Sequence, residues 1–110
     1  MKVIFKEPGQ IARPLLVKDF DDMKKYVIPD LFPENSMVQA VPIFGGYWLL
    51  CDEEARLKDN PPAPNVNIDF IVGGIVLGNI IICGEKDGDF ASVQDYHVNK
   101  IIDWLKEVSI

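Results

Sequence analysis

Alternating apolar and polar positions open the chain. Residues 2–6 place Val3 and Phe5 at a period of two, which predicts a short β-strand. Pro8-Gly9 then marks a turn, and residues 13–18 are extended again with an apolar centre. We therefore expect these two runs to form an opening hairpin.

The spacing of apolar residues changes to three and four over residues 19–27, which predicts a helix. Asp19 is expected to cap its first turn, since an aspartate side chain accepts hydrogen bonds from free N–H groups there. Pro29 is expected to end the helix, because proline removes a donor and clashes with the preceding turn. The buried face is predicted to hold Phe20, Met23, Tyr26 and Val27.

A second hairpin is predicted over residues 37–51. The β-branched residues of 37–43 indicate a strand, Gly45-Gly46 a tight turn, and residues 47–51 the returning strand. Residues 52–60 are polar and lead into Pro61-Pro62-Ala63-Pro64-Asn65. Because prolines cannot donate to a central ladder, we expect residues 61–65 to form a rigid, extended belt across the surface.

Apolar residues return as a β pattern over residues 70–83, interrupted by glycines that indicate a bulge or bend. An alternative is that Gly78 and Asn79 close a hairpin between residues 71–77 and 80–83. Residues 85–89 are predicted to form an acidic turn.

The last segment has a regular helical pattern. Ser92 is expected to cap the helix, with Asp95 three residues later as in a capping box. Its apolar stripe is formed by Val98, Ile101, Ile102, Leu105 and Val108. We expect this helix to pack across one face of the sheet. The prediction is an α+β fold, a single small domain over residues 1–110 with a mostly antiparallel β-sheet packed with two helices.

Charge and composition narrow the function classes. The 110 residues carry a net charge of −6 with scattered basic residues, which disfavours direct binding to nucleic acid or anionic membranes. A mimic of DNA charge is a minor alternative. The apolar run over residues 70–83 is too short for the ~20 residues of a membrane span, and residues 1–6 lack signal-peptide features. We therefore expect a cytoplasmic protein, with Cys51 and Cys83 as buried free thiols unless neighbouring strands join them.

Residues suited to catalysis are sparse. The sequence has one histidine, His97, and no nucleophile elbow, phosphate-binding loop or dinucleotide fingerprint. The acidic clusters at residues 52–54 and 87–89 are typical of solvated turns. Trp48 and Trp104 are predicted core anchors, whereas Tyr47 is a candidate for stacking on a ligand or partner if it points outward beside Gly45-Gly46.

Several segments, read in order, form one pattern. They are residues 2–9 (KVIFKEPG), 50–58 (LCDEEARLK) with Pro61-Pro62 and Asn65, 71–76 (IVGGIV) and 88–92 (GDFAS). This pattern resembles the bacterial and phage domain-of-unknown-function family 3846 nearly end to end, with an insertion-like departure over residues 28–35. The resemblance implies a protein carried by phages, plasmids or integrated elements, and assigns no activity. Asp52, Glu53, Pro62 and Asn65 match the polar part of the pattern. A purely structural role for them is an acidic turn and an asparagine that hydrogen-bonds the proline-rich segment to the sheet.

Three functions are open at this point. We expect a non-enzymatic accessory protein that binds a host or element protein, with a homodimer also possible. The alternative is a binder of a small molecule such as a nucleotide signal, with Arg56 and Lys58 lining its pocket. The second alternative is a small hydrolase that uses Asp52, Glu53 or His97. The candidate binding residues are Asp52, Glu53, Arg56, Asn65 and Tyr47. No catalytic residue, metal ligand or cofactor is predicted.

Overall fold

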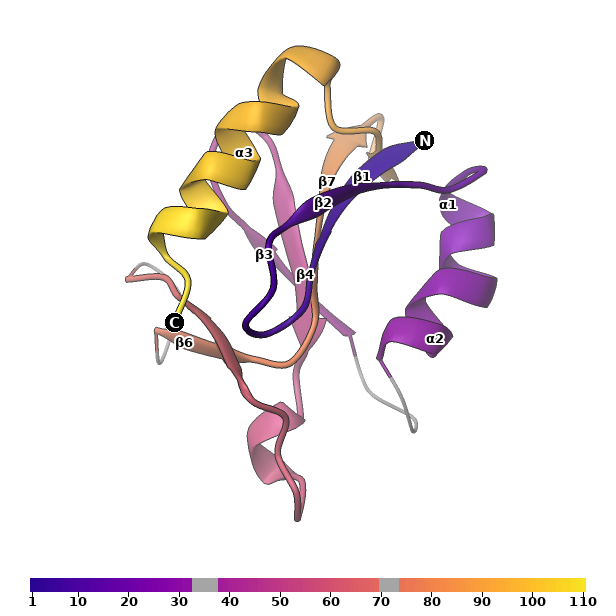
Figure 1. Ribbon diagram of the computed structural model, residues 1–110. Helices are drawn as coiled ribbons and strands as arrows, with labels where there is room; N and C mark the ends of the chain where they lie inside the picture. The colour runs from indigo at the N-terminus through magenta and orange to yellow at the C-terminus, as the bar shows by residue number, and fades with distance from the viewer. Residues whose placement is uncertain (33–37, 70–73) are drawn as a thin grey trace.

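Antiparallel strands form the main sheet of the computed structural model, which describes residues 1–32, 38–69 and 74–110 (Figure 1). Across the sheet the order is β2 (Arg13–Leu16), β1 (Lys2–Lys6), β7 (Ile80–Lys86), β4 (Trp48–Asp52) and β3 (Val38–Pro42), and β8 (Asp89–Ala91) pairs with the end of β7. A second, two-stranded sheet contains β5 (Pro64–Asn67) and β6 (Ile75–Leu77). The predicted opening hairpin is confirmed, because β1 and β2 pair antiparallel.

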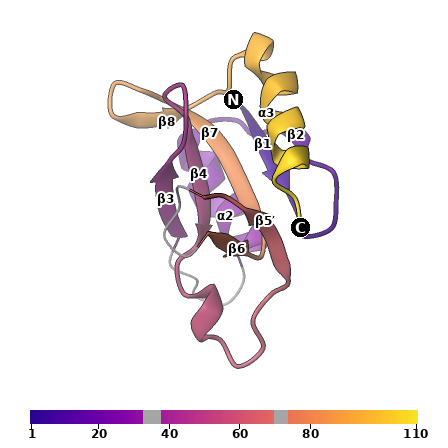
Figure 2. The same ribbon diagram turned by 90° about the vertical axis from the view of Figure 1, so that its left-hand side faces the viewer.

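Helical layers cover both faces of the main sheet (Figures 1 and 2). On one face lies α3 (Asp95–Glu107), together with the small sheet. On the other lies a segment made of α1 (Phe20–Asp22), a π-helical turn (Met23–Val27) and α2 (Ile28–Leu31). The predicted α+β fold with two helices is therefore confirmed.

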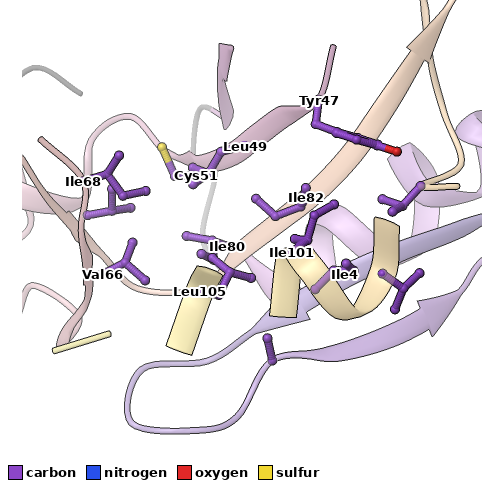
Figure 3. Close-up of a cluster of buried hydrophobic side chains, with 14 residues drawn as sticks. Ile4, Tyr47, Leu49, Cys51, Val66, Ile68, Ile80, Ile82, Ile101 and Leu105 are labelled. Carbon is purple, nitrogen blue, oxygen red and sulfur yellow. The ribbon is translucent and has the colours of Figure 1, made fainter. Parts of the chain in front are cut away.

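Burial on both faces explains the unbroken apolar run in β7. Ile80 and Ile82 point toward α3, where they pack with Leu49, Ile101 and Leu105 (Figure 3). Ile81 and Cys83 point to the opposite face and join the cluster beneath the first helical segment. A strand with one solvated face would alternate apolar with polar residues, whereas a strand covered on both faces is apolar throughout.

The first helical segment begins as predicted, with the Asp19 carboxylate accepting from the Asp22 amide at 2.8 Å. The prediction that Pro29 ends it is wrong, since helix continues to Leu31. The π-helical turn widens the backbone just before Pro29, which then occupies the first turn of α2, where a missing N–H breaks no helical bond. The wider turn also shifts the helical phase, so that Tyr26, predicted to be buried, is 69% exposed.

The apolar stripe of α3 is confirmed, with Val98, Ile101 and Leu105 buried, but the predicted cap is wrong. The helix begins at Asp95, and its preceding residue makes no side-chain capping bond. The Ser92 hydroxyl instead accepts from the Lys2 amide at 3.1 Å, and Asp95 pairs with the Lys2 ammonium at 2.8 Å. These two polar residues therefore tie the start of α3 to β1.

The β3–β4 hairpin is confirmed over its described part, with Gly45 and Gly46 at positive φ (64° and 80°) in the turn; residue 37 lies outside the described residues. The alternative hairpin at residues 78–79 is wrong, because β6 pairs with β5 while β7 pairs with β1 and β4. Residues 70–73 of the predicted strand lie outside the described residues. The acidic turn at 85–89 closes a β7–β8 hairpin through Asp87 and Gly88, both at positive φ.

Prolines occupy the margins of both sheets. Pro14 lies in β2 and Pro42 in β3, the two edge strands of the main sheet, where each proline removes one N–H donor and so makes strand addition less favourable. The belt predicted over residues 61–65 ends earlier than expected, because Pro64 is the first residue of β5. A proline is tolerated there because β5 lies in a two-stranded sheet and the proline begins it.

Both tryptophans, predicted as core anchors, pack against the core clusters but are half-buried at their margins. Trp104 packs edge-on against Phe44 with ring centroids 4.9 Å apart. The Trp48 indole N–H donates to the Glu85 carboxylate at 2.8 Å. An indole that keeps its N–H near solvent-exposed acceptors is typical of the core margin.

Candidate functional site

Three of the five predicted binding residues meet in one groove of about 270 Å³. Asp52 is the last residue of β4, Glu53 follows it, and Arg56 comes from the 3-10 turn Ala55–Leu57. The opposite wall is β6. The remaining lining residues are Gln39, Cys51, Ala55, Ile75, Val76 and Leu77. We call this the β4–β6 groove.

Arg56 joins the two walls of the groove, because its guanidinium donates to the Ile75 carbonyl oxygen of β6. Apolar side chains flank this contact. Leu57, next to Arg56 in the 3-10 turn, is 82% exposed, and Ile75 is 39% exposed. Leu57 is therefore a surface residue that contributes little to the core.

Asp52 fixes the shape of the turn that carries Arg56. One carboxylate oxygen accepts from the Glu54 amide at 2.9 Å, and the other pairs with the Lys58 ammonium at 2.7 Å. Its side chain is only 7% exposed, whereas Glu53 and Glu54 are exposed. Among the described residues, neither glutamate has an ion-pair partner. Asp52 therefore positions the groove, and the glutamates give its rim negative charge.

Asn65 lies outside the groove and is fully buried. Its amide nitrogen donates to the carbonyl oxygens of Lys6 (2.9 Å) and Gly78 (2.8 Å). Its amide oxygen accepts from the Lys6 ammonium at 2.5 Å. The structural role anticipated for Asn65, holding the proline-rich segment to the sheet, is thus present in full. Its partner Lys6 was not predicted, although Lys6 shares a strand face with buried Ile4, two residues earlier.

The outward orientation that ligand stacking by Tyr47 requires is not formed. Tyr47 is 6% exposed and lies in the buried cluster (Figure 3). Its hydroxyl is hydrogen-bonded to Nδ1 of His97 on α3. The Gln94 amide also donates to the Tyr47 hydroxyl at 3.3 Å. Pairing across to α3 satisfies the phenol in the core, so its ring is not free to stack on a ligand.

Of the three hydrolase candidates, Asp52 and Glu53 line the same groove, whereas His97 lies apart from them. His97 is held by Tyr47, just before β4, whereas Asp52 is the last residue of β4. Five residues of extended chain separate Tyr47 from Asp52, about 16 Å at ~3.3 Å per residue. No group of three or more His, Cys, Asp or Glu side chains able to hold a metal ion occurs in the described part of the chain.

The basic pocket expected for a nucleotide signal is divided in two. Arg56 lines the β4–β6 groove, whereas Lys58 lines a separate pocket of about 420 Å³ with Pro8, Phe32 and Asn79. Lys58 is also paired with Asp52, which reduces its value as a phosphate ligand. Arg56 and Lys58 therefore line different pockets rather than the single basic pocket expected.

Cys51 and Cys83 are buried free thiols, as predicted. They lie on opposite faces of the sheet, Cys51 in the cluster with α3 and Cys83 in the cluster with the first helical segment. Burial raises the pKa of Cys51 to about 11, with added repulsion from Asp52 and Glu53, and burial raises that of Cys83 to about 12. Neither thiol is suited to act as a nucleophile near neutral pH.

Comparisons place the chain in a family without adding an activity. No helix among the described residues is long and apolar enough to span a membrane. No curated protein matches the sequence, and no solved structure matches it. A family model described as domain of unknown function DUF3846 matches residues 1–106, and the chain belongs to that family.

Proposed function

We propose that this protein is a non-enzymatic protein-binding module, and that the β4–β6 groove is its binding surface. The observation that carries the proposal is a groove lined by exposed Glu53, Arg56 and Ile75, with the exposed Leu57 next to Arg56 in the chain. Apolar side chains next to a charged rim are typical of a protein contact. The resemblance to family 3846 implies a protein carried by phages or bacterial mobile elements, so we propose a host or element protein as the partner.

The chemistry of the rim specifies the partner further. Glu53 and Glu54 are exposed and have no ion-pair partner among the described residues, and the chain carries a net charge of −6. A partner segment that carries basic residues beside an apolar residue would meet both the glutamates and Leu57. Strand addition at the main sheet is disfavoured by Pro14 and Pro42, so we propose side-chain docking rather than β-augmentation.

Display of random peptides on phage, selected against the immobilised protein, tests this proposal. We expect enrichment of peptides with Lys or Arg next to a large apolar residue. Leu57→Asp should lower the affinity for an enriched peptide about tenfold or more, the loss typical of a buried contact. The double variant Glu53→Lys, Glu54→Lys should lower this affinity by a similar factor.

Matched control variants show whether a loss of affinity is specific to the groove or follows from the same change at any exposed position. Leu16→Asp replaces another exposed leucine, which is 76% exposed on β2, and Asp103→Lys with Glu107→Lys reverses two exposed charges on α3. Both control variants should retain peptide affinity. Absence of enrichment, or equal losses in control and groove variants, would refute the groove as the binding surface.

A further inference from the structure

Lys6 is a buried cation without a counter-charge. It is 2% exposed, and its ammonium meets two neutral oxygens, Asn65 Oδ1 at 2.5 Å and the Glu7 carbonyl at 3.4 Å. Among the described residues, no carboxylate lies within ion-pair distance of it. Burial lowers the pKa of Lys6, because the charged form loses solvation. A buried charge of this kind is normally matched by an opposite one.

Lys6 lines a cavity of about 220 Å³ whose other walls are mostly apolar. The turn between β1 and β2 forms one side, and the C-terminal end of α3 with the residues after it forms the other; Figure 2 shows these segments next to each other. The walls beside Lys6 include Ile11, Ala12, Ile102, Lys106 and Ile110. Ile11 and Ile110 are 80% and 58% exposed, so the cavity is open at an apolar rim.

We infer that this cavity binds a small organic carboxylate with an apolar tail. On binding, the Lys6 ammonium, which is bonded to Asn65 in the free protein, would turn toward the carboxylate and gain its missing counter-charge, while Lys106 adds positive charge at the cavity. The tail would lie against Ile11, Ile102 and Ile110. At ~30 Å³ for each water-sized group, the cavity holds about seven or eight non-hydrogen atoms, the size of hexanoate.

A phosphate ester fits this site less well than a monocarboxylate. A phosphate carries close to two charges and takes several donors, usually from arginine or a row of backbone amides. The cavity lining contains two lysines and no arginine. No residue lines both this cavity and the β4–β6 groove, so the inference does not depend on the proposed function.

Titration of the isotope-labelled protein with hexanoate, followed by NMR chemical shifts, tests the inference. We expect saturable shifts at Lys6, Ile11, Ile102 and Lys106, and binding about ten- to a hundredfold tighter than that of 1-hexanol, which has the same tail without the charge. Lys6→Met should remove this preference for the anion. The matched control Lys100→Met, at an exposed position of α3, should leave it unchanged.

The comparison of hexanoate with hexanol on the unaltered protein decides the question even if Lys6→Met does not fold. Equal affinity for the two compounds, or no saturable shift with hexanoate at millimolar concentration, would overturn the inference. So would saturable shifts confined to the β4–β6 groove. Leu57→Asp, which tests the proposed function, should bind hexanoate as the unaltered protein does.

Discussion

Asn65→Ala is expected to be among the most destabilising single changes in this protein. The amide of Asn65 is fully buried and connects three elements that lie far apart in the sequence. It donates to the carbonyl oxygens of Lys6 in β1 and Gly78 before β7, and it accepts from the Lys6 ammonium. Alanine removes all three bonds and leaves their partners in the core without replacements.

The magnitude follows from those partners. Each carbonyl oxygen left without a donor costs about 1 kcal/mol, and the ammonium left without its strongest acceptor costs about 2 kcal/mol. The expected loss in free energy of unfolding is therefore about 4 kcal/mol, a large part of the ~5–15 kcal/mol typical of a domain. For a chain of this size the melting temperature would fall by roughly 15–25 °C.

Urea unfolding followed by tryptophan fluorescence measures this loss, since Trp48 and Trp104 are half-buried and report on the core margins. Asn67→Ala is the matched control, because Asn67 lies exposed on the same strand. It should change stability by less than about 0.5 kcal/mol. A loss below about 1 kcal/mol for Asn65→Ala, with an unchanged denaturant slope, would refute the role given to its amide.

Three further predictions concern buried groups. The pKa values of Cys51 and Cys83 are raised to about 11 and about 12, so neither thiol should react with Ellman's reagent at about pH 8 until guanidinium chloride unfolds the chain. Rapid reaction in the native state would contradict their burial. Gly84→Ala should cost about 2 kcal/mol in thermal melts, because the added methyl would lie 2.6 Å from the Ser92 carbonyl oxygen; an unchanged melting temperature would contradict this contact. Burial lowers the pKa of Lys6 below its ordinary value of 10.5, so the unfolded chain holds more protons as the pH approaches that value. The unaltered protein should therefore become more stable relative to Lys6→Met as the pH rises toward 10.5, as measured from urea midpoints. A stability difference that does not change with pH would refute the lowered pKa of Lys6.

Elements with a regular apolar period could be predicted from the sequence, because that period reports directly on burial. The stripe of α3 is the example, since Val98, Ile101 and Leu105 are all buried. The β7 strand was less well defined, because burial on both faces removes the alternation that separates one strand from the next. Asp87-Gly88 did carry a hairpin signal, since both positions favour positive φ, and it was interpreted only as a turn.

Predictions from local sequence rules, such as capping-box spacing, were wrong where a residue binds a partner far away in the sequence. Ser92 and Asp95 have the spacing of a capping box, yet both bind Lys2, some ninety positions earlier. Pro29 would end a regular α-helix, but the π-helical turn before it removes the conflict. The Lys6–Asn65 contact spans 59 positions, and no periodicity links its two residues. Such pairs are decided by tertiary packing, which a single sequence does not display.

The polar residues that match the family pattern have different physical roles. Asp52 braces the turn through Glu54 and Lys58, and Asn65 holds β5 to the main sheet, so changes at either position act through stability. Glu53 is exposed and unpaired among the described residues, so a change there acts on the surface alone. A combined variant of Asp52, Glu53 and Asn65 would lose binding to any partner simply by unfolding. The groove is tested cleanly only through Glu53, Glu54 and Leu57, whose side chains contribute little to the core.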